Sequence, residues 1–251
     1  MTDDRDLVLT DCPSPNHEPR PPAAAIDMLI LHYTGMRSGD AASDRLCDAT
    51  AKVSSHYMIE EDGRVWRLVP EERRAFHAGV SYWQGERDIN SRSVGIELVN
   101  PGHEFGYRPF PAAQMAALIP LARAIMARHG ISPARVLGHS DVAPTRKTDP
   151  GELFDWRGLA RHGVGLWPSG AEDEPPPGPA VMPLDAPCAA AATLQEKLAA
   201  FGYETPRSAA LDAATRMVVT AFQRHFRPGR IDGQLDEETL VRLDKMLLLG
   251  G

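Results

Sequence analysis

Cysteine is scarce in this chain of 251 residues, which contains only Cys12, Cys47 and Cys188. The three are widely spaced and odd in number, and none belongs to a C-x-x-C unit. This pattern excludes a complete disulfide framework. We therefore expect free thiols, which suit a reducing compartment.

Long apolar runs are also absent. No stretch of the sequence approaches the roughly 20 apolar residues that a membrane-spanning helix requires. Residues 1–11 carry Asp3, Asp4, Arg5 and Asp6 and no apolar segment, so no signal peptide is visible. These absences predict a cytoplasmic protein, with the cell envelope as the alternative.

Positive charge is in deficit, because the formal net charge is −7. A protein built mainly to bind nucleic acid or an anionic membrane would show the opposite balance. The content of 43% hydrophobic and 24% charged residues is typical of a globular protein. The length suits one domain of ordinary size and a second, small one.

The clearest boundary is a segment rich in proline and acidic residues at 168–187. Proline removes backbone donors and resists helix formation, so this segment is expected to be an extended linker. We predict a catalytic domain at 1–167 and a helical domain at 188–251 on either side of it.

The first domain alternates strand and helix signals. Apolar runs and alternating patterns predict strands at 28–31, 53–59, 65–69, 93–99 and 136–138. The second and third should form a hairpin, because Asp62-Gly63 between them favours a tight turn. Helical spacing predicts one long helix over 111–129, ending at Gly130. The fold class is α/β, with a mixed central β-sheet flanked by helices.

The C-terminal part shows helical spacing only. We expect helices at 193–201, 213–226 and 236–249, which together form a small three-helix bundle near the lower size limit for independent folding. The side chains expected to point inward are Leu194, Leu198, Phe201, Met217, Val218, Ala221 and Phe222.

Two histidines stand at the ends of predicted strands, His32 and His139. A strand end can direct an imidazole into a cleft, where it binds a metal or makes a structural hydrogen bond. The loop after His139 brings back Lys147 and Asp149, whose side chains share one face if this segment is extended. Two histidines and a carboxylate are a common ligand set for catalytic zinc. An ordinary polar loop with an Asp–Lys contact is the alternative.

Glu97 lies in the middle of a predicted strand, between the apolar residues Ile96 and Leu98. Burial of a carboxylate is costly unless the group is paired or functional. Either Glu97 serves a site, or its face of the sheet is solvated.

Several short segments of the first domain occur together in a recognisable order: Leu31-His32-Tyr33-Thr34, Val53-Ser54-Ser55-His56-Tyr57, His77-Ala78-Gly79, Asn90 to Glu97 and Gly138-His139-Ser140-Asp141. This set resembles the AmpD/AmiD family of N-acetylmuramoyl-L-alanine amidases, which share a fold with the peptidoglycan recognition proteins, and the resemblance covers most of residues 25–160. In the C-terminal part, Leu194-Gln195, Phe201-Gly202-Tyr203, Ala221-Phe222-Gln223 and Asp232-Gly233 resemble a helical peptidoglycan-binding domain.

The resemblance implies a Zn²⁺ ion held by His32, His139 and Asp149. It further implies that Glu97 is the catalytic carboxylate and Lys147 an active-site lysine. A peptidoglycan or muropeptide substrate is implied as well, cleaved between N-acetylmuramic acid and L-alanine.

Other residues have weaker assignments. His77 and Tyr33 are expected to contact substrate, whereas His56 and Asn90 are expected to be structural. The remaining histidines have no partner pattern and are expected at the surface: His17, His103, His129, His162 and His225.

Two alternative functions use the same fold and residues. A peptidoglycan receptor would bind without cleavage, although such a protein typically lacks a zinc ligand. An endopeptidase would use the same metal chemistry to cut within the stem peptide.

Overall fold

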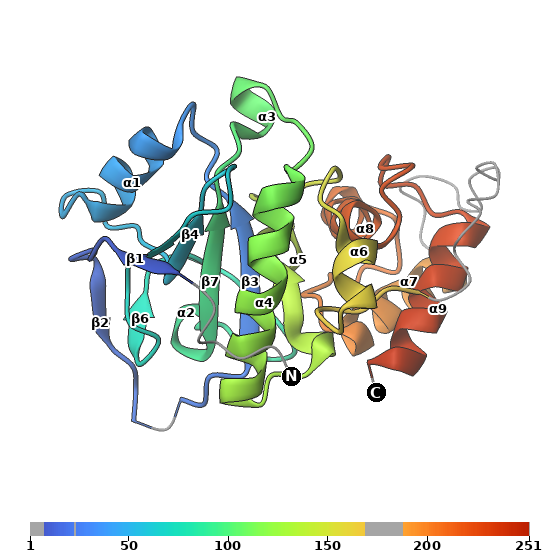
Figure 1. Cartoon of the computed structure of the whole chain (residues 1–251). Coiled ribbons are helices and arrows are strands. Elements are labelled where there is room, and N and C mark those ends of the chain that lie inside the picture. Colours follow the sequence, from blue (N-terminus) through green and yellow to red (C-terminus); the bar gives the residue numbers. More distant parts are fainter. Residues whose placement is uncertain (1–7, 23, 169–187, 251) are drawn as a thin grey trace.

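The computed structural model describes residues 8–22, 24–168 and 188–250. The predicted linker at 168–187 lies outside the described residues except for Pro168, which is buried. The division into two domains at this segment therefore stays a prediction. Figure 1 shows the whole chain, with the central sheet and the C-terminal helices. Residues 188–250, which contain these helices, are called the C-terminal module below.

A six-stranded mixed sheet forms the centre, in the order β1-β5-β4-β7-β3-β8. All neighbouring pairs are parallel except β4 and β5, which form the predicted antiparallel hairpin. The strands are β1 (Leu9–Asp11), β3 (Met28–Tyr33), β4 (Tyr57–Ile59), β5 (Val65–Arg67), β7 (Ser93–Leu98) and β8 (Val136–Gly138). Strands β2 (His17–Pro19) and β6 (Arg73–Ala75) form a separate antiparallel pair.

Among the described residues 8–22 and 24–168 there are six α-helices, of which α4 is the long predicted one. It ends at Gly130, which adopts the left-handed conformation. The helices are α1 (Gly39–Cys47), α2 (Ile89–Arg92), α3 (Gly102–Phe105), α4 (Ala112–His129), α5 (His139–Val142) and α6 (Trp156–Arg161). No helix among the described residues is long and apolar enough to cross a membrane.

The central strands separate two apolar layers. Leu29 and Leu31 of β3 pack with Val94 and Ile96 of β7 in the cluster that contains the inner face of α4. The intervening residue Ile30 belongs instead to a cluster formed largely by the C-terminal module. This alternation follows from the period of two in a strand. Side chains on the second face, opposite α4, are the ones available for a site.

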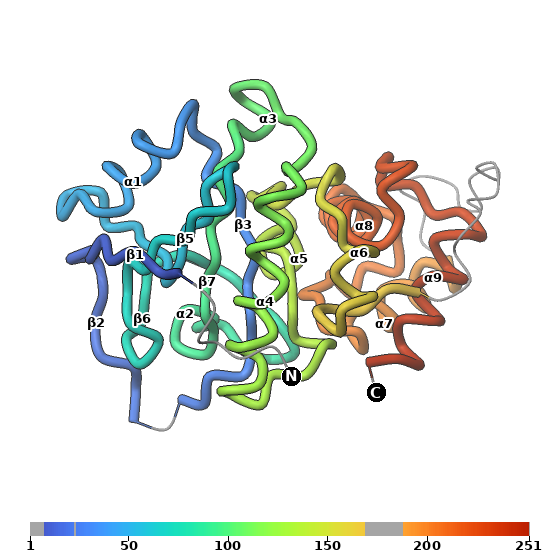
Figure 2. Tube along the Cα trace, in the orientation of Figure 1, coloured from blue at the N-terminus to red at the C-terminus, as the bar shows by residue number. Residues whose placement is uncertain are grey.

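The C-terminal module consists of α7 (Ala189–Phe201), α8 (Ala213–Phe226) and α9 (Glu237–Leu249), close to the predicted ranges. Figures 1 and 2 both place these helices beside α5 and α6. The predicted inward residues are buried except Met217, which is 42% exposed. The prediction that Met217 points inward was wrong, because the buried face of α8 contains Val218, Phe222 and Phe226 instead.

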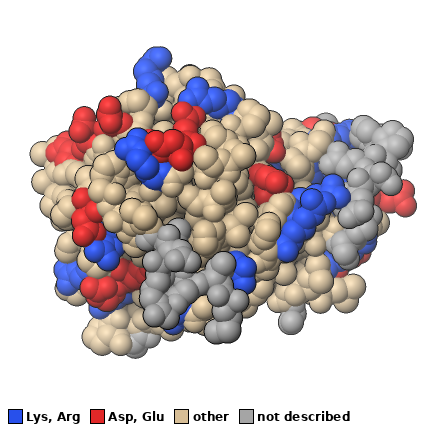
Figure 3. Space-filling model, in the orientation of Figure 1, with Lys and Arg blue, Asp and Glu red and all other residues tan. Residues whose placement is uncertain are grey.

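Charged side chains of both signs are interspersed on the face shown in Figure 3. This face therefore presents no extended basic surface among the described residues.

The thiols of Cys12 and Cys47 are free, with their sulfur atoms 3.5 Å apart.

Candidate metal centre and active site

Strand register brings three polar residues to one level of the sheet. His32 of β3 pairs directly with Glu97 of the parallel strand β7. On the other side of β3, Leu31 pairs with Gly138, so His139 follows at the level of His32. His32 and Glu97 both alternate with residues that face α4, and they therefore share the opposite face of the sheet.

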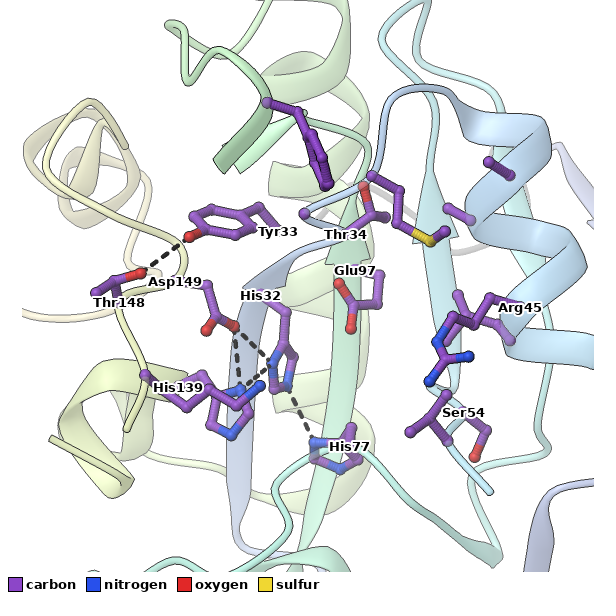
Figure 4. Close-up of a pocket in the computed structure, with 18 of the residues that line it drawn as sticks. His32, Tyr33, Thr34, Arg45, Ser54, His77, Glu97, His139, Thr148 and Asp149 are labelled. Atoms are coloured by element: carbon purple, nitrogen blue, oxygen red, sulfur yellow. Dashed lines mark hydrogen bonds and ion pairs between the residues drawn. The ribbon is translucent and has the colours of Figure 1, made fainter. Parts of the chain in front are cut away.

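His32, His139 and Asp149 converge in a buried cluster (Figure 4). The two Nδ1 atoms are 2.9 Å apart, and Asp149 Oδ2 lies 3.0 Å from that of His32 and 3.1 Å from that of His139. The backbone carbonyl of Asp149 accepts a hydrogen bond from Ser140 N, which ties the two loops together. These three residues are the predicted ligand set.

A chain of hydrogen bonds sets the orientation of His32. Ser93 donates its hydroxyl hydrogen to Ile89 O, so its oxygen is free to accept from His77 Nε2 at 3.2 Å. The other nitrogen of His77 then accepts from His32 Nε2 at 3.1 Å. In this tautomer His32 carries its proton on Nε2, and the lone pair of its Nδ1 faces the cluster.

His139 is oriented in the same way, because its Nε2 lies 3.0 Å from the carbonyl oxygen of Ala78 and donates to it. Its Nδ1 lone pair also faces the cluster. Burial lowers the pKa of His32 to about 4, with His139 as a further cause. Burial alone would raise the pKa of Asp149, but the neighbouring His139 and His32 hold that pKa well below its usual range.

Two lone-pair nitrogens and one ionised carboxylate oxygen facing one point form a donor set for a divalent metal ion. At about 3 Å from one another, these three atoms can hold a proton or a divalent cation between them. The residues of the cluster therefore fit a metal ion.

Gly95 leaves room for the ring of His77, which is hydrogen-bonded to His32. It lies between Ser93 and Glu97 on the site face of β7, and a Cβ atom there would come within 2.6 Å of the His77 ring. The glycine in the Gly95-Ile96-Glu97 segment is thus required by the close approach of an imidazole to the strand.

Glu97 faces the same space and is little solvated. Its Oε2 atom is buried and has no hydrogen-bond partner among the described residues. Burial raises the pKa of Glu97 well above its usual value, and the negative charge of Asp149 adds to this, while Lys147 opposes it. The carboxylate is therefore not a solvated surface group, which was the alternative interpretation from sequence.

A cavity of about 730 Å³ opens over these residues. It is also lined by Lys147, His77 and Tyr33, so every predicted site residue borders one space. The Tyr33 hydroxyl lies 2.9 Å from Thr148 Oγ1 and 3.0 Å from His103 Nδ1, at the rim. The structure places Tyr33 and His77 but does not test whether they contact substrate.

The opposite wall of the cavity was not found from the sequence. Arg45 of α1 and Ser54 lie across the cavity from His139 and Asp149 in Figure 4. Arg37 also borders the cavity, with its guanidinium 4.5 Å from the ring centre of Phe105. Ser54 belongs to a segment that carries the resemblance, but no local pattern marks Arg37 or Arg45, because only the placement of α1 and of the residues just before it brings them to the site.

Two of the weaker expectations agree with the structure. His56 is buried, and its Nδ1 accepts from Gly95 N at 2.9 Å. The side-chain oxygen of Asn90 accepts from the backbone nitrogens of His77 and Ala78. These hydrogen bonds are consistent with the predicted structural role of both residues.

The surface prediction for His225 was wrong. Its ring is buried and stacks between Trp156 and Phe226, with centroid distances of 3.7 and 3.8 Å. His225 follows the buried Phe222 by three residues on α8, and this spacing was the available signal for an inward position.

Comparison with known proteins gives two family matches. The N-acetylmuramoyl-L-alanine amidase family model matches residues 22–152, and a peptidoglycan binding domain model matches residues 189–243. N-acetylmuramoyl-L-alanine amidase AmiD of Escherichia coli is 40% identical over 247 residues, covering 88% of this chain and 82% of that protein. The 1,6-anhydro-N-acetylmuramyl-L-alanine amidase AmpD of Enterobacter cloacae is 34% identical over 161 residues, 57% of this chain and 84% of AmpD.

Solved structures agree over nearly the whole length. AmiD of E. coli, in complex with anhydro-N-acetylmuramic acid-L-Ala-D-gamma-Glu-L-Lys, superposes with a TM-score of 0.78 at 37% identity, covering 92% of this chain and 93% of that one. AmpDh3 of Pseudomonas aeruginosa gives a TM-score of 0.75 at 33% identity, covering 90% and 92%. The predicted resemblance and fold class are thereby confirmed, and the chain belongs to the N-acetylmuramoyl-L-alanine amidase family.

Proposed function

We propose that this protein is a zinc-dependent amidase that cleaves the bond between N-acetylmuramic acid and L-alanine in muropeptides or peptidoglycan. The observation that carries the proposal is the buried cluster of His32, His139 and Asp149 with Glu97 in the same cavity. The substrate class comes from the relatives, one of which is bound to an anhydromuramyl tripeptide.

His32, His139 and Asp149 would hold the zinc ion. When bound, zinc polarises the amide carbonyl and lowers the pKa of a coordinated water to about 7. The donor set matches zinc in its mixture of imidazole nitrogen and carboxylate oxygen. His77, Ser93 and the carbonyl of Ala78 keep both imidazoles oriented for this task.

Glu97 is the proposed general base and acid. Its unpartnered Oε2 is available to take a proton from the attacking water, and later to deliver one to the departing L-alanine nitrogen. The raised pKa of Glu97 brings this carboxyl closer to the working pH, where transfer in both directions is effective.

Lys147 is the proposed electrostatic partner. It lines the cavity beside Asp149, and its ammonium group can offset negative charge that develops on the carbonyl oxygen in the tetrahedral intermediate. His77 and Tyr33, which border the same cavity, are retained as proposed substrate contacts.

The cavity wall that lies opposite His139 and Asp149 suits the peptide part of the substrate. A γ-linked glutamate, as in the tripeptide bound to AmiD, leaves a free α-carboxylate. Arg37 and Arg45 present guanidinium groups along this wall, and guanidinium binds carboxylates well. We propose that the peptide runs from the cluster toward α1.

The C-terminal module is proposed to bind peptidoglycan or its fragments, as the matching domain model indicates. We propose a role in cell-wall recycling or remodelling. The cytoplasm, with the cell envelope as the alternative, stays the predicted location.

The decisive test is mass spectrometry of products formed from purified anhydromuropeptides by zinc-loaded and chelator-treated protein. Free stem peptide and unsubstituted muramic sugar, produced only with zinc, are the expected result. Unchanged substrate despite bound zinc would favour a receptor, and shortened peptides still attached to the sugar would indicate an endopeptidase.

A further inference from the structure

One buried carboxylate, Asp141, links the C-terminal module to the turn that carries His139. Asp141 belongs to α5, two residues after the ligand His139, and is almost fully buried. Its Oδ2 accepts a hydrogen bond of 2.7 Å from Gly138 N, the backbone nitrogen just before His139. Asp141 thus closes the turn that presents His139 to the cluster.

The other two partners of this carboxylate come from the C-terminal module. The Tyr203 hydroxyl donates to Asp141 Oδ1 at 2.7 Å, and His225 Nδ1 lies 2.7 Å from Oδ2. Both contacts span more than 60 residues of sequence. Burial, together with the negative charge of Asp141, raises the pKa of Tyr203, so its hydroxyl remains a donor.

Both donors are themselves held by packing. His225 is stacked between Trp156 of α6 and Phe226 of α8. Tyr203 packs edge-on against Trp83 at a ring-centroid distance of 5.0 Å. Neither side chain can leave Asp141 without disturbing an aromatic contact, so the position of the carboxylate is well defined.

We propose that Tyr203 and His225 are positioning residues for the metal site, which they serve by fixing Asp141 and, through it, the turn that carries His139. In this proposal the C-terminal module is a structural part of the metal centre as well as a substrate-binding unit. The inference rests on the proposed metal-binding function of His32, His139 and Asp149. Groups that hydrogen-bond a metal ligand directly typically change metal affinity about 10- to 100-fold when lost. We expect the lower end of this range here, because Tyr203 and His225 act through Asp141.

The test uses the full chain and two substitutions that keep the aromatic packing. Tyr203→Phe removes only the hydroxyl, and His225→Phe keeps a stacked ring but removes the donor. The matched control is Arg87→Gln, which breaks an exposed ion pair between Arg87 and Glu204 across the same contact, without any link to Asp141. Each protein is titrated with zinc against a chromophoric chelator, and its visible spectrum is recorded with cobalt(II) in place of zinc.

The variant that combines both substitutions is expected to bind zinc about 10-fold more weakly, with an altered cobalt spectrum, whereas Arg87→Gln matches the wild type. The single Tyr203→Phe variant should lie in between and guards against misfolding of the double variant. Zinc affinity and cobalt spectra equal to wild type would overturn the positioning role, even if the variants unfold at lower temperature. A wild-type protein that takes up no zinc would overturn the proposed metal site itself, which is a separate outcome.

Discussion

At the residue scale, the proposed chemistry depends on the raised pKa of the buried Glu97 carboxyl group. The apolar strand and the neighbouring Asp149 favour its protonated form, while Lys147 favours its charged form. This balance distinguishes Glu97 from Asp149, whose charge is favoured by two imidazoles. Two carboxylates in one cavity thus receive different roles from their surroundings.

Replacement of Glu97 should therefore remove catalysis but leave metal binding. We expect Glu97→Gln to lower kcat by about 10²- to 10⁴-fold, the usual contribution of a general acid–base group. Amide cleavage is measured by release of stem peptide, and zinc content by elemental analysis. Loss of zinc in Glu97→Gln would contradict the assignment, because Glu97 would then act as a ligand.

The pH dependence of kcat/KM should reveal the raised pKa of Glu97. A general base must be ionised, so activity falls as the pH drops through its pKa, here at a higher pH than for an ordinary glutamate. Because Lys147 lowers the pKa of Glu97, Lys147→Gln should move this acid limb to higher pH, while Lys147→Arg should not. Identical acid limbs in Lys147→Gln and wild type would argue against the coupling.

The same pKa shift predicts a change in stability. A raised folded-state pKa contributes stability at low pH that is lost as the pH rises through that pKa. In chelator-treated protein, Glu97→Gln should therefore gain stability relative to wild type as the pH rises, because the amide carries no buried charge. Urea unfolding at several pH values measures this. A constant difference across the range would contradict the buried, raised-pKa carboxylate.

At the element scale, the site depends on parallel register. Strands β7, β3 and β8 are adjacent and parallel, so their carboxyl ends place Glu97, His32 and His139 side by side. A shift of one residue in β7 would turn Glu97 toward α4 and destroy the arrangement. The apolar residues that face α4 therefore fix the site indirectly, because they fix the register.

Gly95 offers a test at this scale. The Cβ atom in Gly95→Ala would clash with the His77 ring, displacing it from its contact with His32. We expect zinc affinity to fall about 10- to 100-fold, as for other lost supports of a metal ligand. Competition with a chelator measures this fall. The control is Gly85→Ala, where a Cβ atom meets no atom within 4 Å but the φ of 89° strains the backbone, so this variant should lose stability and keep its zinc affinity. Equal affinity in both variants would refute the argument.

At the scale of the whole molecule, the C-terminal module completes the hydrophobic core. Met28, Ile30 and Trp83 of the first part share one buried cluster with side chains of α7, α8 and α9. The small size of the module, which predicts marginal independent stability, is offset by this shared burial. The two parts of the chain thus stabilise each other.

Removal of the module should therefore destabilise the remainder. A chain that ends at Trp167 would expose the apolar face around Ile30 and Trp83 and leave Asp141 without two of its partners. We expect its thermal midpoint to fall by at least about 5 °C, since a few kcal/mol lost shifts a domain of this size that far. Differential scanning calorimetry measures the midpoint. An unchanged midpoint would show that the first part folds independently of the module.

The sequence by itself determined β3, β4, β5, β7 and β8, the long helix, the hairpin and the candidate ligands, whereas β1, β2, β6 and α1 were not predicted. Local patterns predict these features: strand alternation around Glu97, helical spacing over 111–129, and histidines at strand ends. The motif resemblance added the family, which the comparisons confirm. Chemistry that depends on a short motif can therefore be recognised in the order of the amino acids alone.

Only the tertiary structure decided the rest. The packing of α1 brought Arg45 to the cavity, and the docking of α8 buried His225 against Asp141. His77 became a support of His32 because Gly95 lets its ring lie against the strand. These contacts join segments far apart in the chain, and no local pattern encodes which distant side chain will supply the partner. A buried polar group must find a hydrogen-bond partner, but the fold alone determines which one.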